Sequence, residues 1–263
     1  MPDIVLATIN ARYVHASLGL RCLFANLGAL QAQARIVEFV SGGGIESMLE
    51  RILALRPRIV GFGVYVWNVD ETTRLVAQLR CVAPEVRVVV GGPEVSHEPD
   101  AQRLCALADF VVSGPGELAF AQLCRQLLHG PRPLMKSITG ATPDLDALAS
   151  PYPYYDARDV RERFVYVEAS RGCPFKCEFC LSSLDRTAEP FALEPFLAEL
   201  DALHRRGARR FKFVDRTFNL KAATGAAILE FFLQRLAAAP DDPVFAHFEL
   251  VPDHLPQRLK DAI

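Results

Sequence analysis

The chain has 263 residues, of which 51% are hydrophobic and 23% are charged, a globular composition long enough for two cores of ordinary size. A formal net charge of −2 excludes a strong overall field that would attract nucleic acid or an anionic membrane. No apolar run approaches the ~20 residues that span a bilayer, and the start at Met1 does not resemble a signal peptide. We therefore expect a cytoplasmic location, where thiols stay reduced.

Residues 1–130 alternate between short apolar strands and amphipathic helices. Strands are predicted at residues 3–9, 35–40, 58–66, 86–90 and 110–112. Helices are predicted to begin after Ser17, at Ile45, after a cap at Asp70, and at Glu117, the last one running to about His129. This order predicts an α/β fold with a doubly wound parallel sheet of the Rossmann or flavodoxin type. Ligands of such sheets bind beyond the carboxyl ends of the strands.

The remaining sequence divides into a linker and a second βα series. Residues 131–162 carry recurring prolines and little helical periodicity, which predicts a linker. Within residues 163–263, strands are predicted at 164–169, 210–215 and 245–250. Helices are predicted between these strands, one of them over 222–238, and a last one from about Asp253. Three βα units do not close a barrel, so we expect the first part of a TIM-like barrel and a chain that is the front part of a longer protein.

Three cysteines, Cys173, Cys177 and Cys180, lie within eight positions of the segment SRGCPFKCEFC. A reducing compartment and an odd number of cysteines argue against a disulfide. A structural zinc site needs a fourth ligand, for which the candidates are the distant His204 and His247. A thioredoxin-like pair would leave Cys173 unexplained. Three thiolates on an iron–sulfur cluster would leave one iron open to a substrate or cofactor.

The spacing Cys173-x-x-x-Cys177-x-Phe179-Cys180, placed directly after a predicted strand, resembles the cluster motif of the radical S-adenosylmethionine (SAM) superfamily. The resemblance implies a [4Fe–4S] cluster on the three cysteines, with Phe179 beside it and SAM chelated to the open iron. It implies that one electron cleaves the sulfonium to a 5′-deoxyadenosyl radical. A reductant of the flavodoxin or ferredoxin type is then expected as a partner.

The front domain is similar to that of cobalamin-binding radical SAM enzymes. The resemblance rests on VGGPEVS after the fourth predicted strand, VSGPGE after the fifth, and NARYVHASLG, which resembles an uncharacterised branch of that class. It implies a B12-binding Rossmann-like domain over residues 1–130 and a radical SAM domain over 163–263. The implied cofactor contacts in the front domain are Gly91, Gly92, Pro93, Gly114, Gly116 and Glu117.

Each of these features of the front domain has a simpler interpretation. The glycines let the backbone approach a large flat ligand closely, but they could equally form tight strand-to-helix turns. Gly114-x-Gly116 also matches a loose dinucleotide fingerprint, although it follows the fifth strand and not the first. His15 and His97 lie on ligand-side loops outside the Asp-x-His-x-x-Gly arrangement of cobalamin mutases. We therefore expect cobalamin without a protein histidine on cobalt. The neighbouring Tyr65 and Trp67 could pack on the corrin or in the core.

Two carboxylates follow strands of the second series. Asp215 ends the second strand and Glu249 lies near the end of the third, positions that point toward the ligand face of a barrel. The resemblance implies that this region holds the amino group or ribose of SAM. Asp215 could equally cap the following loop or pair with Arg216.

The expected activity is methyl transfer to an unactivated carbon of a small-molecule or peptide substrate that the sequence does not identify. One alternative is a methylthiotransferase-like radical SAM enzyme without cobalamin, but the four remaining cysteines lack the spacing for the second cluster of such enzymes. The other is a truncated, non-catalytic module that binds corrinoid or cluster. No membrane partner is expected, and a nucleic acid is not indicated.

Overall fold

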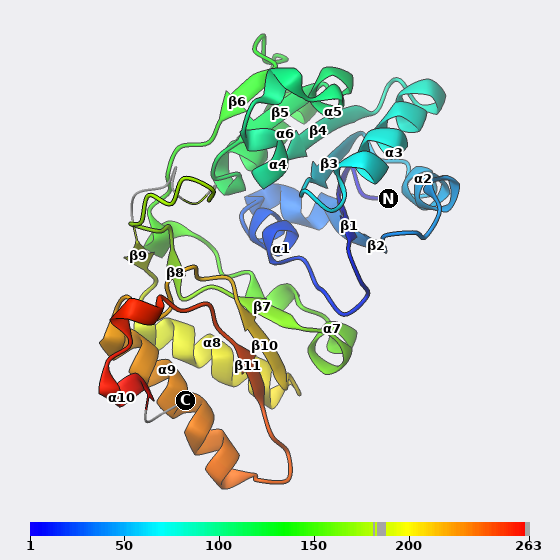
Figure 1. Cartoon of the computed structure of the whole chain (residues 1–263). Helices are drawn as coiled ribbons and strands as arrows, with labels where there is room; N and C mark the ends of the chain where they lie inside the picture. Colours follow the sequence, from blue (N-terminus) through cyan, green and yellow to red (C-terminus); the bar gives the residue numbers. More distant parts are fainter. Residues whose placement is uncertain (181, 183–187, 261–263) are drawn as a thin grey trace. The chain divides into compact units, whose positions relative to one another are not determined.

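The computed structural model describes residues 1–180, 182 and 188–260 (Figure 1). The chain forms two compact units, Met1–Tyr154 (unit 1) and Tyr155–Ile263 (unit 2). The boundary between them falls inside the segment predicted as a linker. None of the described helices is long and apolar enough to cross a bilayer.

Unit 1 is built on a parallel sheet with the strand order β2-β1-β3-β4-β5-β6. Its strands are β1 (Ile4–Asn10), β2 (Ala34–Val40), β3 (Ile59–Gly63), β4 (Arg87–Gly91), β5 (Phe110–Ser113) and β6 (Ser137–Thr139). All neighbouring strands pair in parallel. The order reverses at β1, with β2 on one side and β3 on the other, which is the switch point of a doubly wound sheet. The predicted fold class is confirmed.

Helices cover both faces of this sheet. They are α1 (Leu18–Ala25), α2 (Ile45–Leu53), α3 (Val69–Val82), α4 (Pro93–Ser96), α5 (Arg103–Leu107) and α6 (Glu117–His129), with short 3₁₀ turns at Gly28–Gln33, Pro99–Ala101, Leu145–Ala147 and Tyr152–Tyr154. Apolar residues of α2, α3 and α5 form one core against the sheet. Those of α1 and α6 form the other. Every residue of β1 is buried, which explains why its sequence is mostly apolar.

Three predictions for unit 1 are wrong in detail. The third strand is predicted to run to residue 66, but β3 ends at Gly63. Strand β6 lies in the predicted linker, where it pairs with β5 through the register Val111↔Ser137. Its three residues, two exposed and one half-buried, are too few to show a periodicity. The N-cap of α3 is Asn68, and Asp70 lies in the first turn of that helix. Ser17 does cap α1, because its side chain accepts the Leu20 N–H at 3.3 Å.

Unit 2 contains a second parallel sheet with the order β11-β10-β7. Its elements are α7 (Ala157–Glu162), β7 (Val165–Val167), β8 (Ser170–Arg171), β9 (Glu189–Pro190), α8 (Leu193–Arg205), β10 (Arg210–Phe213), α9 (Ala222–Ala238), β11 (Phe245–His247), a 3₁₀ turn at Pro252–His254 and α10 (Gln257–Lys260). The three strands of this sheet, β7, β10 and β11, lie side by side in chain order. Helix α8 connects β7 to β10 and α9 connects β10 to β11, as in the first units of a barrel. Helix α7 was predicted as linker, and the last helix begins later than predicted, because a 3₁₀ turn replaces its first residues.

Candidate functional site

The cysteine loop starts where β7 ends and is closed at its base by a small antiparallel ladder. Strand β8 pairs with β9, so that Arg171 lies opposite Glu189. The Arg171 guanidinium forms an ion pair with Glu168 at 2.8 Å and lies over the Phe191 ring, 5.8 Å from its centroid. Gly172 follows with a φ of +93°, a conformation that favours glycine. These contacts fix the point at which the loop leaves the sheet.

The three thiols of this loop differ in exposure. Cys173 is buried, Cys180 is partly exposed and Cys177 is exposed, and all three are free of disulfides. The Cys180 N–H donates to the Cys177 carbonyl at 3.0 Å, which forms a turn between these two cysteines. Phe179, in that turn, is 95% exposed.

The donor set fits an iron–sulfur cluster by type and number, since three thiols belong to one short loop. Among the described residues, however, no three Cys, His, Asp or Glu side chains converge on a point where one ion could bind. The three cysteines therefore share one loop, but their thiols do not converge on a single point.

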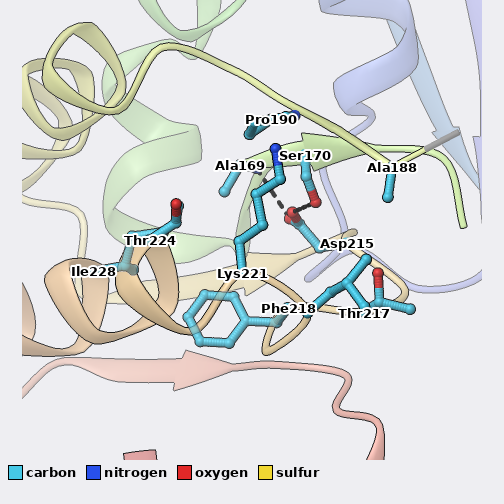
Figure 2. A pocket seen from close by; sticks show the side chains of 11 residues that line it. Ala169, Ser170, Ala188, Pro190, Asp215, Thr217, Phe218, Lys221, Thr224 and Ile228 are labelled. Carbon is cyan, nitrogen blue, oxygen red and sulfur yellow. Dashed lines mark hydrogen bonds between the residues drawn. The ribbon is translucent and has the colours of Figure 1, made fainter. Parts of the chain in front are cut away.

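A small hollow, open to solvent, lies at the carboxyl edge of the second sheet (Figure 2). It is formed by the end of β7, the loop after β10 and the start of α9. The side chains that matter for its chemistry are Ser170, Asp215, Thr217, Lys221 and Thr224. This is the edge at which βα barrels bind their ligands.

Asp215 is the buried carboxylate of this hollow, with 3% of its surface exposed. One carboxylate oxygen accepts the Ala169 N–H at 3.0 Å and the other accepts the Ser170 hydroxyl at 2.6 Å (Figure 2). Burial raises the pKa of the Asp215 carboxyl, and the hydrogen bonds from Ser170 and Ala169 oppose that rise. The side chain is therefore held in one orientation at the end of β10.

The structure separates the two predicted carboxylates. Glu249 does not line the hollow; it forms a half-exposed ion pair with Arg216 at 3.0 Å. The alternative in which Asp215 pairs with Arg216 is therefore wrong. Asn219 exchanges two hydrogen bonds of 2.8 Å with the main chain of Val251 and so fixes the loop.

Sequence reasoning missed four polar side chains of the hollow, namely Ser170, Thr217, Lys221 and Thr224. Their positions in the sequence could have indicated them. They stand directly after a parallel strand or at the start of the helix that follows, which are the places that face a ligand in βα barrels.

We predict that Asp215→Asn removes a pH-dependent penalty on the stability of unit 2. The raised pKa means that folded protein binds more protons than unfolded protein, so the wild type should lose stability as the pH rises from the ordinary carboxyl range through the raised pKa. The asparagine can still accept the Ala169 N–H and can donate to Ser170. Urea denaturation followed by circular dichroism between about pH 4 and pH 8 should show a flatter profile for the variant. The same dependence of the unfolding free energy on pH in both proteins would contradict the prediction.

In unit 1, the switch point is held together by a fully buried amide. The Asn68 side chain donates to Thr8 Oγ1 (3.2 Å) and to the carbonyls of Ile9 (3.0 Å) and Gly63 (3.2 Å), and it accepts the Tyr65 N–H at 2.8 Å. This one side chain ties the ends of β1 and β3 to the start of α3. It leaves no polar group of its own for a ligand.

An aromatic pair stands beside this switch point. The rings of Tyr65 and Trp67 stack with centroids 4.5 Å apart and planes 6° from parallel. Trp67 is 52% exposed and the intervening Val66 is 74% exposed, and burial raises the pKa of the Tyr65 hydroxyl. An exposed apolar loop at the ligand edge of a doubly wound sheet offers a surface for a flat ligand.

The glycines after β4 and β5 are required by the backbone of unit 1 itself. Gly92 has φ of +116°, and a Cβ there would lie 2.5 Å from the Val64 carbonyl oxygen. Gly114 has φ of +73°, and its N–H donates to the Ser96 hydroxyl at 3.2 Å. The structure thus supports the tight-turn interpretation at Gly92 and Gly114, which is compatible with a ligand approaching from outside.

The other predicted residues of unit 1 lie on the same two turns. Pro93 opens α4, Gly116 is the N-cap of α6 with an ordinary negative φ, and Glu117 is the buried first residue of α6. Gly91 ends β4. The predicted histidines differ in exposure, His15 being half-buried and His97 exposed.

Comparison with protein families matches residues 4–124 to the B12 binding domain. A protein of Pyrococcus horikoshii named an uncharacterized methyltransferase is 32% identical over 190 residues, which cover 62% of this chain and 40% of that protein. The cobalamin-dependent radical SAM methyltransferase TokK of Streptomyces tokunonensis is 26% identical over 161 residues, covering 52% of this chain and 23% of TokK.

Among solved structures, the radical S-adenosylmethionine methyltransferase TsrM from Kitasatospora setae, with cobalamin and a [4Fe-4S] cluster bound, superposes with a TM-score of 0.71. It shares 18% identity; the match covers 100% of this chain and 58% of TsrM. The chain therefore spans less than two thirds of the length of each of these relatives. The likeness to TsrM extends the fold across both units.

Proposed function

We propose that this chain, a relative of radical SAM proteins with a B12-binding domain, binds cobalamin on unit 1 and a [4Fe–4S] cluster and SAM on unit 2, and serves methyl transfer to an unactivated carbon. One observation carries the proposal. A B12-binding family match over residues 4–124 is followed, in the same chain, by a three-thiol loop whose base borders a hollow with a buried carboxylate. Neither a structural zinc site nor a thioredoxin-like redox pair would require a B12-binding domain or a buried carboxylate beside the cysteine loop.

Unit 2 supplies the ligands and the orientation in this proposal. Cys173, Cys177 and Cys180 would hold the cluster as thiolates, leaving one iron without a protein ligand. When bound, the cluster supplies one electron to the sulfonium of SAM, and cobalamin supplies a carrier for the methyl group. Asp215, held by Ser170, would accept a hydrogen bond from the α-amino group of SAM just beyond the end of β10.

Unit 1 supplies a surface for the corrin. Tyr65 and Trp67 would lie against it at the switch point, and the turn at Gly92 would bring main-chain groups close. Neither His15 nor His97 stands in a motif that places histidine on cobalt, so we propose that unit 1 would hold cobalamin without a histidine on cobalt. The reductant would be a flavodoxin or ferredoxin, in the cytoplasm.

Anaerobic reconstitution with iron, sulfide and hydroxocobalamin tests this proposal. We expect a broad cluster absorption together with corrinoid bands, and release of 5′-deoxyadenosine after SAM and dithionite are added. Cluster absorption without corrinoid binding would favour an enzyme that lacks cobalamin. Both cofactors without any deoxyadenosine would favour a binding module.

A further inference from the structure

An apolar tip, formed by Leu134 and Met135, projects from the connection between α6 and β6. Leu134 is 101% exposed and Met135 is 71% exposed. Pro131 and Pro133 fix two φ angles on the way to the tip, so the main chain there has little freedom to fold back. In Figure 1 this connection, drawn in green, extends beyond β5 and β6. Single exposed apolar residues are ordinary on protein surfaces, but two adjacent ones at the end of a loop form an apolar surface.

Both ends of the apolar tip are fixed by cations. Arg132, before the tip, forms an ion pair with Asp109 at 3.5 Å and lies over the Phe110 ring, 5.6 Å from its centroid. Lys136, after the tip, donates to the Ala106 carbonyl at 2.9 Å. The two apolar side chains are therefore held out between two positive charges that are themselves anchored to the body of unit 1.

Asp109 is surrounded by more cations than one carboxylate neutralises. Three arginines pair with it at 3.0, 3.2 and 3.5 Å, namely Arg80, Arg87 and Arg132. The carboxylate is buried, whereas the three guanidinium groups stay partly exposed. Lys136 adds a fourth cation, and Glu85, in the turn between α3 and β4, adds a second anion. Four cations and two anions leave a local excess of two positive charges around the apolar tip.

These charges and the apolar tip lie at the amino edge of the first sheet. Arg87 begins β4, Asp109 directly precedes β5 and Lys136 directly precedes β6. Ligands of a doubly wound sheet bind at the opposite, carboxyl edge. The net charge of −2 gave no reason to expect a membrane partner, but the charge of unit 1 is unevenly distributed. The amino edge is therefore a basic and apolar surface that the proposed cofactors do not use.

We propose that this edge is a docking surface for an anionic lipid bilayer, in which Leu134 and Met135 enter the boundary of headgroups and acyl chains and the cations face the headgroups. Such a bilayer supplies an apolar phase and negative charge within reach of one loop. An acidic protein would supply the charge, but residues 131–136 contain no tryptophan or tyrosine, the aromatic residues that anchor many protein interfaces. The proposal is independent of the cofactors proposed above.

Sedimentation of the full chain with lipid vesicles tests the proposal. Vesicles of equal parts phosphatidylglycerol and phosphatidylcholine should bind the chain. Vesicles of phosphatidylcholine alone should bind it at least about tenfold more weakly, because each cation near an anionic surface contributes roughly a fivefold gain in affinity. Raising the ionic strength to about 1 M should weaken binding to the anionic vesicles, since salt screens exposed charges.

Two variants remove the apolar tip and the charge separately. Leu134→Ser combined with Met135→Ser should weaken binding to the anionic vesicles about tenfold or more, since two apolar side chains no longer leave water. Both side chains are exposed, so this variant should unfold like the wild type by circular dichroism. Arg132→Gln should weaken the same binding about fivefold. Asp109 keeps two arginine partners in that variant.

Two matched controls change unit 2 in the same ways. Leu233→Ser combined with Leu236→Ser removes two exposed leucines from α9. Lys260→Gln removes an exposed cation from α10. Both controls should leave binding to the anionic vesicles unchanged, because the proposed surface lies in unit 1.

Several results would overturn the proposal. They are no binding to the anionic vesicles, equal binding to the neutral ones, unchanged binding by the serine variant of the tip, or an equal loss in the leucine control. Soluble poly(glutamate) or an oligonucleotide that binds more tightly than the vesicles at the same concentration of charge would assign the surface to an acidic protein or a nucleic acid instead. A dimer in light scattering that the serine variant of the tip abolishes would assign it to a second copy of the chain.

Discussion

Replacing Cys173, Cys177 and Cys180 together with serine should abolish the uptake of iron and inorganic sulfide that reconstitution gives in the wild type. We expect about four irons and four sulfides per chain before the change and none after it, since a [4Fe–4S] cluster is held by cysteine thiolates. Each single replacement should also prevent stable loading, because two thiolates would remain for four irons. Iron and sulfide analysis after gel filtration measures the result.

Cys81→Ser is the control for this experiment. Cys81 is an exposed free thiol of α3 in unit 1, so its loss tests whether any accessible cysteine contributes. It should leave the iron and sulfide contents unchanged. A triple variant that still takes up sulfide would contradict the prediction. So would a wild-type chain that binds a single zinc ion and no sulfide.

The fold of unit 1 was predictable because its central strands β1, β3 and β4 are buried on both faces. IVLATI and VRVVV are apolar runs, each interrupted by a single polar residue and separated by helices with one apolar stripe, and that pattern specifies a covered parallel sheet. The end of α9 was predictable for a different reason: Pro240 follows Ala238 by two positions, and a helix does not continue through a proline.

The missed elements are short and depend on partners distant in sequence. Strand β6 exists because residues 137–139 add to the edge of β5, and nothing within those three residues specifies this pairing. Helix α7 is made by a capping box in which Asp156 and Asp159 bond each other's main-chain N–H, a signal hidden in a segment read as linker.

The candidate site was predictable only where the spacing of residues carries the chemistry. Three cysteines in eight positions can be recognised in the sequence without a structure. The environment of Asp215 cannot, because its hydrogen bonds come from Ala169 and Ser170, 46 and 45 residues earlier. The buried hydroxyl of Thr217, which has no hydrogen-bond partner among the described residues, is likewise a property of packing. Sequence reasoning therefore located the ligand edge and Asp215, but not the other polar side chains that line the hollow.

Gly92→Ala should destabilise unit 1 by about 3 kcal/mol or more, even without corrinoid. The φ of +116° and ψ of 174° lie in a region that is essentially restricted to glycine, at a cost of ~1–3 kcal/mol for another residue. The new Cβ would also lie 2.5 Å from the Val64 carbonyl, so β3 and β4 would have to separate at their carboxyl ends. Trp67, the single tryptophan, lies in the loop after β3 and reports this unfolding by its fluorescence.

Gly28→Ala separates strain from steric overlap. Gly28 also has a positive φ, +59°, but nothing lies within 4 Å of its Cβ position, and it precedes β2 at the opposite edge of the sheet. This variant should cost only about 1 kcal/mol and leave hydroxocobalamin binding unchanged. Gly92→Ala should weaken that binding at least about tenfold, because the turn that it distorts borders the switch point. If Gly92→Ala abolished corrinoid binding without changing the stability of unit 1, Gly92 would serve only to let the ligand approach. The steric requirement for glycine next to the Val64 carbonyl would then be wrong.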